Sequence, residues 1–239
     1  MRLSRLFIDA PLTPGLLHLP EAQAHYLARV LRLAPGAPLQ LFNGQGPEYR
    51  GTLVEVDRKR VSVRLDEAVE ALPDSPLRVH LGQGLSRGER MDWAIQKATE
   101  LGVTEITPLF SERCEVRLNE ERGDKRLAHW RQVAISACEQ CGRAVVPVIH
   151  PPRALDAWLA DVRADLKLVL HPVAAPLGQH PRPATLAFLI GPEGGLSENE
   201  VERARHAGFQ GARLGPRVLR TETAPVVALS VAQQLWGDF

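Results

Sequence analysis

The chain has 239 residues, of which 44% are apolar and 24% are charged. This composition is ordinary for a globular protein and argues against a disordered chain. The net charge of +1 comes from 29 basic and 28 acidic side chains, so any nucleic acid must be bound by local patches rather than by the field of the whole chain. No apolar run approaches the roughly 18 to 20 residues of a membrane helix, and the N-terminus lacks a signal-peptide pattern. We therefore expect a cytoplasmic protein.

Residues 1–72 predict a small β-barrel. Turn sequences (APGAP, NGQGP and DRK) separate short segments in which apolar and polar residues alternate, as in barrels of short strands. One helix is expected from Glu21 to Leu33, where apolar residues recur with helical spacing. The segments expected as strands are 39–42, 49–56 and 60–65.

The segment ALPDSP at 71–76 predicts a linker, because its two prolines break both periodicities. After it, apolar strands alternate with longer helices, which indicates a mostly parallel sheet covered on both faces. We therefore expect two domains, 1–72 and 73–239. The strands expected in the second domain are 77–85, 106–110, 166–171, 185–190 and 212–214.

Five helices are expected in the second domain, and capping boxes and closing glycines mark the ends of two of them. The helices are 86–102, 124–142, 154–162, 197–207 and 222–236. The residues at the marked ends are Ser86, Glu89 and Gly102 for one helix, and Ser197, Glu200 and Gly208 for the other.

The stretch GQGLSRG at 82–88 lies between an expected strand and helix, like the glycine loop of a dinucleotide-binding fold. Its third glycine falls one residue late, with Arg87 where the helix must pack closely on the sheet. Glu105 stands at a plausible distance for a ribose contact, but an ordinary strand-to-helix turn is the favoured interpretation. Nicotinamide binding is not supported.

The three cysteines are too few for the disulfide framework of a secreted protein, so reduced thiols are expected. Cys138 and Cys141 lie one helical turn apart, but structural zinc needs two further ligands. The only nearby residues that could provide these ligands are Cys114 and His129, and their spacing matches no known zinc motif. We therefore interpret Cys138 and Cys141 as small buried residues. The polar members of EQCGR (139–143) are either the lining of a site or a solvated helix face.

Two unusual stretches, LIGPEGGLSENE at 189–200 and LGPRVLRTET at 214–223, each follow an expected strand and lead towards a helix. Ligands of α/β proteins bind at such strand ends. GPEGG lacks the lysine and hydroxyl residue of a phosphate loop, which disfavours a nucleoside triphosphate. A tight connection that uses glycine for backbone freedom is the alternative.

Together, FLIGPEGGLSENE, LGPRVLRTETA, SERCEVRL and ISACEQCGR resemble the 16S ribosomal RNA (uracil-N3) methyltransferase family of the SPOUT class. The resemblance extends over the whole chain, including RLSRLF, ARVLRL and GQGLSRGERMDWAIQKATELGV. It implies an α/β fold with a PUA-like N-terminal β-barrel and a C-terminal domain tied in a trefoil knot. It also implies a homodimer that methylates N3 of a uridine in 16S rRNA with S-adenosylmethionine, and no partnership with DNA or a membrane.

The expected cofactor site lies where three strands end. S-adenosylmethionine carries no phosphate, so its site needs shape and close backbone approach, which glycine-rich loops allow. His171 could instead be a metal ligand. However, no other histidine or carboxylate lies at the spacing of a metal site, so no metal is expected. The expected cofactor-binding residues are Leu170, His171, Ile190, Gly191, Pro192, Glu193, Gly194, Leu214, Gly215, Val218, Leu219 and Thr223.

Methylation of uridine N3 requires an activated nucleophile, because this imide nitrogen carries a proton at neutral pH. We expect the guanidinium of Arg220 to stabilise the uridinate through O2 or O4. Glu222 is the expected base, directly or through water. The alternative role of Arg220 is a salt bridge that caps the loop.

RNA is expected to be held through its phosphates, which position it without reading its sequence. Each candidate side chain has an equally weighted alternative as a solvated surface residue. The candidates are Arg5, Arg29, Arg32, Arg87, Arg90 and Lys97.

Two other functions stay open at this point. Relatives in the SPOUT class methylate guanine N1 of transfer RNA or a ribose 2′-hydroxyl, and a non-catalytic RNA-binding factor could keep both domains. The intact GPEGG and VLRTET stretches favour an active enzyme. The sequence does not indicate the rRNA position, the proton acceptor, or whether naked RNA or an assembled subunit is the substrate.

Overall fold

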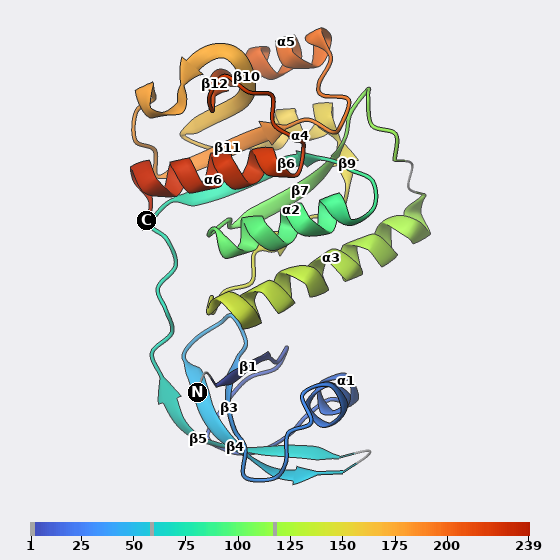
Figure 1. Cartoon of the computed structure of the whole chain (residues 1–239), viewed down its shortest axis with the longest axis vertical. Coiled ribbons are helices and arrows are strands. Elements are labelled where there is room, and N and C mark those ends of the chain that lie inside the picture. The colour runs from blue at the N-terminus through green and yellow to red at the C-terminus, as the bar shows by residue number, and fades with distance from the viewer. Residues whose placement is uncertain (1–2, 58–59, 117–118) are drawn as a thin grey trace. The chain divides into compact units, whose positions relative to one another are not determined.

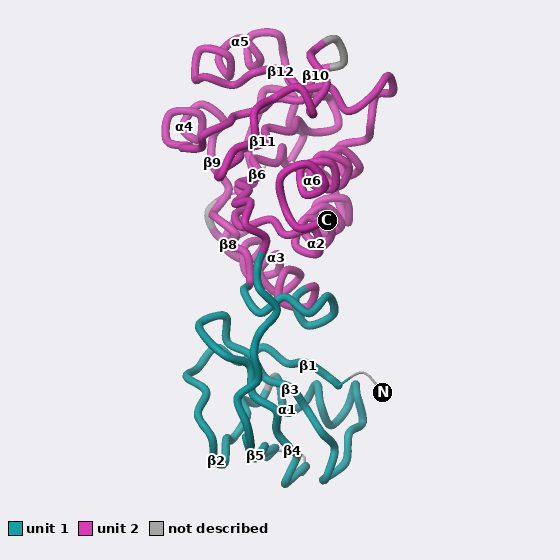
Figure 2. The backbone as a smooth tube through the Cα atoms, turned by 90° about the vertical axis from the view of Figure 1, so that its left-hand side faces the viewer, with its two compact units in different colours: residues 1–74, 138–145 teal, residues 75–137, 146–239 magenta. Residues whose placement is uncertain are grey.

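The computed structural model of the chain describes residues 3–57, 60–116 and 119–239. Its contacts divide the chain into two units, one of residues 1–74 with 138–145 and the other of residues 75–137 with 146–239 (Figure 2). Within the described residues, no helix is long and apolar enough to cross a membrane.

Unit 1 is built on a five-stranded sheet in the order β1-β3-β4-β5-β2. All its strand pairs are antiparallel except β1 with β3. Alternate residues such as Leu39, Leu41 and Val63 enter the core, as the two-residue repeat of a strand requires. The DRK turn lies only partly within the described residues. The strands are β1 (Ser4–Phe7), β2 (Gly15–His18), β3 (Pro38–Phe42), β4 (Glu48–Val56) and β5 (Val61–Val69).

The helix expected from Glu21 to Leu33 is shorter and changes pitch. Helix α1 (Glu21–His25) runs into a turn of π-helix, η1 (Tyr26–Val30). The wider pitch appears in the bond from Leu31 N to the Tyr26 carbonyl, 3.0 Å, which spans five residues. Arg32 then adopts a φ of +51°, a left-handed conformation that cannot continue the helix.

A buried ion pair between Arg5 and Glu48 lies in unit 1. The two side chains are 8% and 2% exposed and are joined by a 2.5 Å contact. Arg5 also donates to the carbonyls of Cys138 and Arg143, at the end of helix α3 (Glu120–Cys141), where a cation complements the helix dipole. The expected contact of Arg5 with RNA is corrected accordingly, because its guanidinium is enclosed by a carboxylate and helix-end carbonyls.

The EQCGR stretch fastens the end of α3 to the sheet of unit 1. Glu139 accepts a 3.0 Å hydrogen bond from the Phe7 amide, and Arg143 pairs with Asp74 at 3.3 Å. Cys138 is fully buried, and burial raises the pKa of its thiol to about 12. The interpretation as a small buried residue is therefore confirmed for Cys138, whereas Cys141 is only half-buried.

Unit 2 is built on a parallel sheet in the order β12-β10-β11-β6-β7-β8, with β9 beside β7. Two of its strands, β8 and β9, have two residues each, too few to give a sequence pattern. The strands are β6 (Arg78–Gly84), β7 (Glu105–Phe110), β8 (Val148–Ile149), β9 (Arg153–Ala154), β10 (Leu166–Pro176), β11 (Thr185–Ile190) and β12 (Gln210–Arg213).

Helices cover both faces of this sheet, which confirms the predicted α/β fold (Figure 1). Along β11, Leu186, Phe188 and Ile190 pack towards α2, α3 and α6, whereas Ala187 and Leu189 pack towards α4 and α5. The helices are α2 (Glu89–Glu100), α4 (Leu155–Asp161), α5 (Glu198–His206) and α6 (Thr223–Trp236), with a short 3-10 turn, η2 (Leu177–Gln179).

One of the two predicted capping boxes is present. Ser197 and Glu200 exchange both bonds at the start of α5. At α2 the prediction is wrong, because Gly88, with a φ of +59°, precedes the helix. Ser86 is thereby outside the helix, and its hydroxyl donates to the Gly84 carbonyl at 3.3 Å.

Candidate functional site

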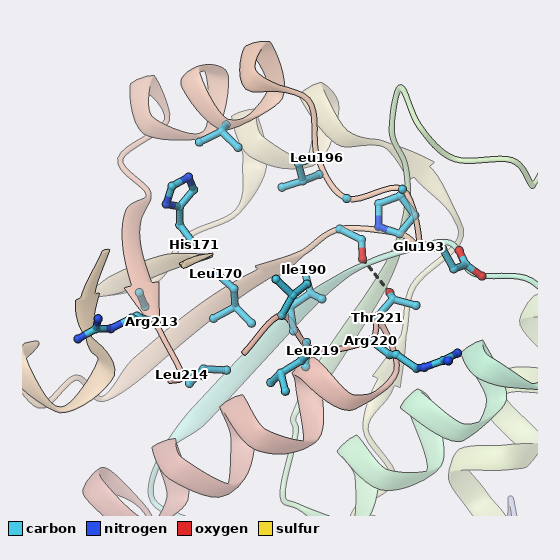
Figure 3. A pocket seen from close by; sticks show the side chains of 18 of the residues that line it. Leu170, His171, Ile190, Glu193, Leu196, Arg213, Leu214, Leu219, Arg220 and Thr221 are labelled. Atoms are coloured by element: carbon cyan, nitrogen blue, oxygen red, sulfur yellow. Dashed lines mark hydrogen bonds between the residues drawn. The ribbon is translucent and has the colours of Figure 1, made fainter. Parts of the chain in front are cut away.

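A cavity of about 920 Å³ opens at the carboxyl ends of β10, β11 and β12 (Figure 3). It is lined by 170–171 of β10, the loop 190–196 after β11, the segment 212–222 after β12, and parts of α2 and α5. Parallel sheets bind their ligands at this edge, and the volume is that of a site for a small organic molecule.

The glycines of GPEGG (191–195) let backbone pack against backbone. A Cβ atom on Gly191 would lie 2.9 Å from the amide nitrogen of Leu196, and one on Gly194 would lie 3.0 Å from the Cβ of Arg113. The Gly195 amide closes a turn on the Pro192 carbonyl at 2.9 Å, with a φ of +70° at Gly195. The loop is therefore closely packed, and its glycines expose backbone atoms rather than side chains to the cavity.

Apolar side chains from all three strand ends form the floor of the cavity. Leu170, Ile190, Leu214 and Leu219 gather there, and Arg220 points away from them (Figure 3). The hydroxyl of Thr221 donates to the Gly191 carbonyl at 2.7 Å, which joins the segment 212–222 to the GPEGG loop.

Charged side chains occupy one side of the cavity. Glu193 accepts from the Arg87 amide at 3.0 Å and from the Arg90 guanidinium at 2.9 Å, and Arg90 also lies 3.9 Å from Glu222. Partial burial raises the pKa of Glu193, but these hydrogen bonds outweigh it and hold the pKa below its usual range. Arg220 is exposed and forms no ion pair with the residues that the structure describes, so the loop-capping salt bridge is not seen.

Most of the predicted site residues line this cavity. Thr223 does not, because it begins α6 with its amide bonded to the Arg220 carbonyl. Sequence reasoning missed Thr221, although its hydroxyl stands two residues away in the same TET motif. The predicted residues in the lining are Leu170, His171, Ile190, Gly191, Pro192, Glu193, Gly194, Leu214, Gly215, Val218, Leu219, Arg220 and Glu222, with Arg90 from the RNA-binding set.

Apart from the buried Arg5, the other residues expected to bind RNA are exposed or half-exposed. Arg29 and Arg32 are exposed in unit 1. In unit 2, Arg87 forms an ion pair with Glu115 at 2.5 Å, and Lys97 forms one with Glu100 of the same helix at 2.7 Å. Surface pairs of this kind contribute little free energy, so they do not prevent these cations from binding a phosphate.

Three metal-capable side chains meet elsewhere in unit 2, namely His80, Glu105 and His150. Glu105 Oε2 lies 2.8 Å from His150 Nε2 and 3.9 Å from His80 Nδ1. His80 Nε2 lies 2.8 Å from the Thr107 hydroxyl and 3.2 Å from the Trp158 indole nitrogen, so Nδ1 is the ring nitrogen that faces Glu105.

His80 predicts a pH dependence of stability. Burial lowers its pKa from 6.5 to about 4, against the opposing effect of Glu105. A base whose pKa is lower in the folded state takes up its proton first in the unfolded state, so the free energy of unfolding falls as the pH drops from 6.5 towards 4. We expect a loss on the order of 3 kcal/mol across this window.

The measurement is urea unfolding of the wild type and of His80→Gln at pH 7 and pH 4. Glutamine keeps an acceptor for the Trp158 indole but takes up no proton. The wild type should lose more stability than the variant between the two pH values. Equal losses would show that His80 does not cause the dependence.

Two known protein families match this chain. Residues 73–233 match the RNA methyltransferase domain family, and residues 19–66 match the RNA methyltransferase PUA domain family. A ribosomal RNA small subunit methyltransferase E from Buchnera aphidicola (subsp. Acyrthosiphon pisum) is 33% identical over 100% of this chain and 96% of its own length. The chain belongs to the ribosomal RNA small subunit methyltransferase E family.

Two solved structures resemble this methyltransferase over their full lengths. The family member from Neisseria gonorrhoeae, bound to S-adenosylmethionine, has a TM-score of 0.93 at 38% identity, with 100% of both chains covered. A methyltransferase from Legionella pneumophila, with the same cofactor bound, has a TM-score of 0.97 at 41% identity, again with 100% of both chains covered. The predicted SPOUT fold with a PUA-like N-terminal domain is confirmed.

Proposed function

We propose that this methyltransferase binds S-adenosylmethionine in the 920 Å³ cavity and methylates N3 of a specific uridine in 16S rRNA. The observation that carries the proposal is a cavity with an apolar floor and walls rich in backbone, beside Arg220, which forms no ion pair with the described residues. Such a site suits a purine nucleoside without phosphates. The cofactor in the two similar structures supports the same occupant.

In the proposed complex, the adenine lies against the apolar floor of Ile190, Leu214 and Leu219. Amides and carbonyls of the GPEGG loop and of the segment 212–222 contact its polar edge. Because these contacts come from backbone, they need the close approach that the glycines allow. The cofactor-binding residues that the sequence predicts and that line the cavity therefore stay predictions.

The reaction is an in-line displacement at the methyl carbon. The N3 lone pair forms the new C–N bond as the C–S bond breaks, and the electron pair of that bond returns to sulfur, leaving S-adenosylhomocysteine. Glu222 takes the N3 proton, directly or through water. Arg220 stabilises the uridinate through O2 or O4. Arg90 lies 3.9 Å from Glu222, so the proposed base has a cation as its neighbour at the edge of the cavity.

The proposal includes a trefoil knot in unit 2. The knot is supported by two contacts at the strand ends: the Thr221 hydroxyl holds the Gly191 carbonyl at 2.7 Å, and Gly84 touches the backbone of Pro192.

The enzyme is further proposed to be a cytoplasmic homodimer that acts on 16S rRNA, either naked or in the assembled small subunit. Trp93 of α2 and Leu235 of α6 are 41% and 42% exposed, and the second copy is proposed to cover these two side chains. RNA phosphates are expected to contact Arg29, Arg32, Arg87, Lys97 and Arg90.

The proposed function is tested by calorimetric titration with S-adenosylmethionine, followed by methyl transfer to 16S rRNA and to small subunits. Digestion to nucleosides and mass spectrometry identify the product. N3-methyluridine is expected. Methylated guanine or ribose would instead support the other acceptors, and cofactor binding without transfer to either substrate would support a binding factor.

A further inference from the structure

The carboxyl end of β6 contacts the GPEGG loop but does not line the cavity. A Cβ atom on Gly84 would lie 2.4 Å from the backbone nitrogen of Pro192, so strand and loop touch through backbone. The preceding residue, Gln83, is 1% exposed and is a buried amide in a strand whose neighbouring core positions are apolar.

Gln83 begins a directed chain of hydrogen bonds. Its Nε2 donates to the Thr221 hydroxyl at 3.0 Å, and that hydroxyl donates its single proton to the Gly191 carbonyl at 2.7 Å. The Ser86 hydroxyl lies 3.4 Å from the hydroxyl oxygen of Thr221. Because Gln83 can only donate through Nε2, it fixes the direction in which the Thr221 proton points.

The chain joins three segments that are far apart in sequence: the end of β6, the GPEGG loop, and the segment 212–222. Thr221 is 7% exposed and stands between Arg220 and Glu222, the two side chains that we assign to the chemistry. A shift of Thr221 therefore moves both. Displacements of about 1 Å at such a site lower rates by roughly 100-fold.

We propose that Gln83 and Thr221 form a lock that holds the GPEGG loop and the segment 212–222 at the spacing the methyl-transfer site requires. Both are positioning residues, and Gln83 acts through Thr221. The inference rests on the proposed function for its effect on catalysis, but the lock itself is a property of the cofactor-free protein.

The side-chain oxygen of Gln83 has no hydrogen-bond partner among the described residues, which indicates that the amide serves to position Thr221 rather than to stabilise the fold. This oxygen, Oε1, is buried. A buried acceptor without a partner destabilises the fold, and a leucine of similar volume would avoid this loss. Such groups persist where a site needs a particular geometry.

Thr221→Val and Thr221→Ser separate the hydroxyl from the shape of the side chain. Valine removes the bond to Gly191 and is expected to raise the dissociation constant for S-adenosylmethionine about tenfold and to lower kcat, whereas serine should stay within about twofold of the wild type. Thr99→Val is the matched control, because Thr99 is also buried and donates to a carbonyl at 2.8 Å within α2. It should lower stability without changing the dissociation constant.

Gln83→Leu gives the sharper test. It should weaken cofactor binding while the free energy of unfolding stays equal to that of the wild type or rises, a combination that a purely structural role would not produce. The double variant Gln83→Leu with Thr221→Val should bind no worse than Thr221→Val alone.

Hydrogen exchange of the amides in 191–195 and 214–222 tests the lock without any cofactor. Faster exchange in Thr221→Val than in Thr221→Ser supports the lock, even if the wild type binds no S-adenosylmethionine, which would overturn only the proposed function. Equal exchange in the two variants, or an unchanged dissociation constant in Thr221→Val, would overturn the lock.

Discussion

Arg220→Ala is expected to lower kcat by about 100- to 1,000-fold, the loss typical of removing one group that stabilises a developing anion. The dissociation constant for S-adenosylmethionine should change little, because Arg220 points away from the apolar floor that we assign to the adenine (Figure 3). Its carbonyl accepts from two amides at the start of α6, and alanine keeps this bond. The fold should therefore persist.

Single-turnover rates and calorimetric binding of S-adenosylmethionine check this expectation. Arg220→Lys retains the charge but not the planar fork, so it should recover only part of the rate. Arg50→Ala is the control, because Arg50 forms an exposed pair with Glu67 in unit 1 and such pairs contribute little. Loss of cofactor binding with an unchanged single-turnover rate would remove Arg220 from the chemistry.

Gly84→Ala is expected to lower the free energy of unfolding by about 3 kcal/mol, the upper range for overpacking a close contact. The added Cβ would lie 2.4 Å from Pro192 N and 2.7 Å from the carbonyl carbon of Gly191, so β6 and the loop must separate. Because this loop lines the cavity, cofactor affinity should fall as well.

Urea unfolding and calorimetric binding measure the two effects of Gly84→Ala. The matched control is Gly123→Ala in α3, where an added Cβ meets nothing within 4 Å. Alanine should stabilise the helix there by about 0.5 to 1 kcal/mol. Wild-type stability and affinity in Gly84→Ala would contradict the close contact.

Gly84 also explains the GQGLSRG stretch, which resembles a dinucleotide loop without being one. Its glycines serve packing: a Cβ on Gly82 would lie 2.5 Å from the Trp158 ring, and one on Gly84 would meet the GPEGG backbone. Sequence reasoning correctly preferred a strand-to-helix turn. It could not find the reason, because the atoms that require glycine come from α4 and from residues about 110 positions later in the chain.

The parallel sheet was predictable because strands buried on both faces carry continuous apolar runs, such as LAFLI in β11. The positions of Arg5 and Ser86 were not. An arginine in RLSRLF looks exposed until Glu48 is known to lie beside it, and Ser86 has the pattern of a capping residue until Gly88 breaks the helix start. In both cases a distant or backbone partner outweighs the local pattern.

The candidate site was predicted mainly from the resemblance carried by GPEGG and VLRTET, and most of those residues do line the cavity. Thr221 and Gln83 were missed for a physical reason: their importance lies in hydrogen bonds across 30 and 138 residues of sequence. The cluster of His80, Glu105 and His150 was missed in the same way, because its members lie on β6, on β7 and just after β8.

The most direct test of the central claim is the nucleoside content of 16S rRNA from cells that lack this protein, measured by mass spectrometry. N3-methyluridine should be absent, and it should return when the wild-type protein, but not Arg220→Ala, is supplied. N3-methyluridine at its normal level, or the loss of a different methylated nucleoside, would contradict the proposed function.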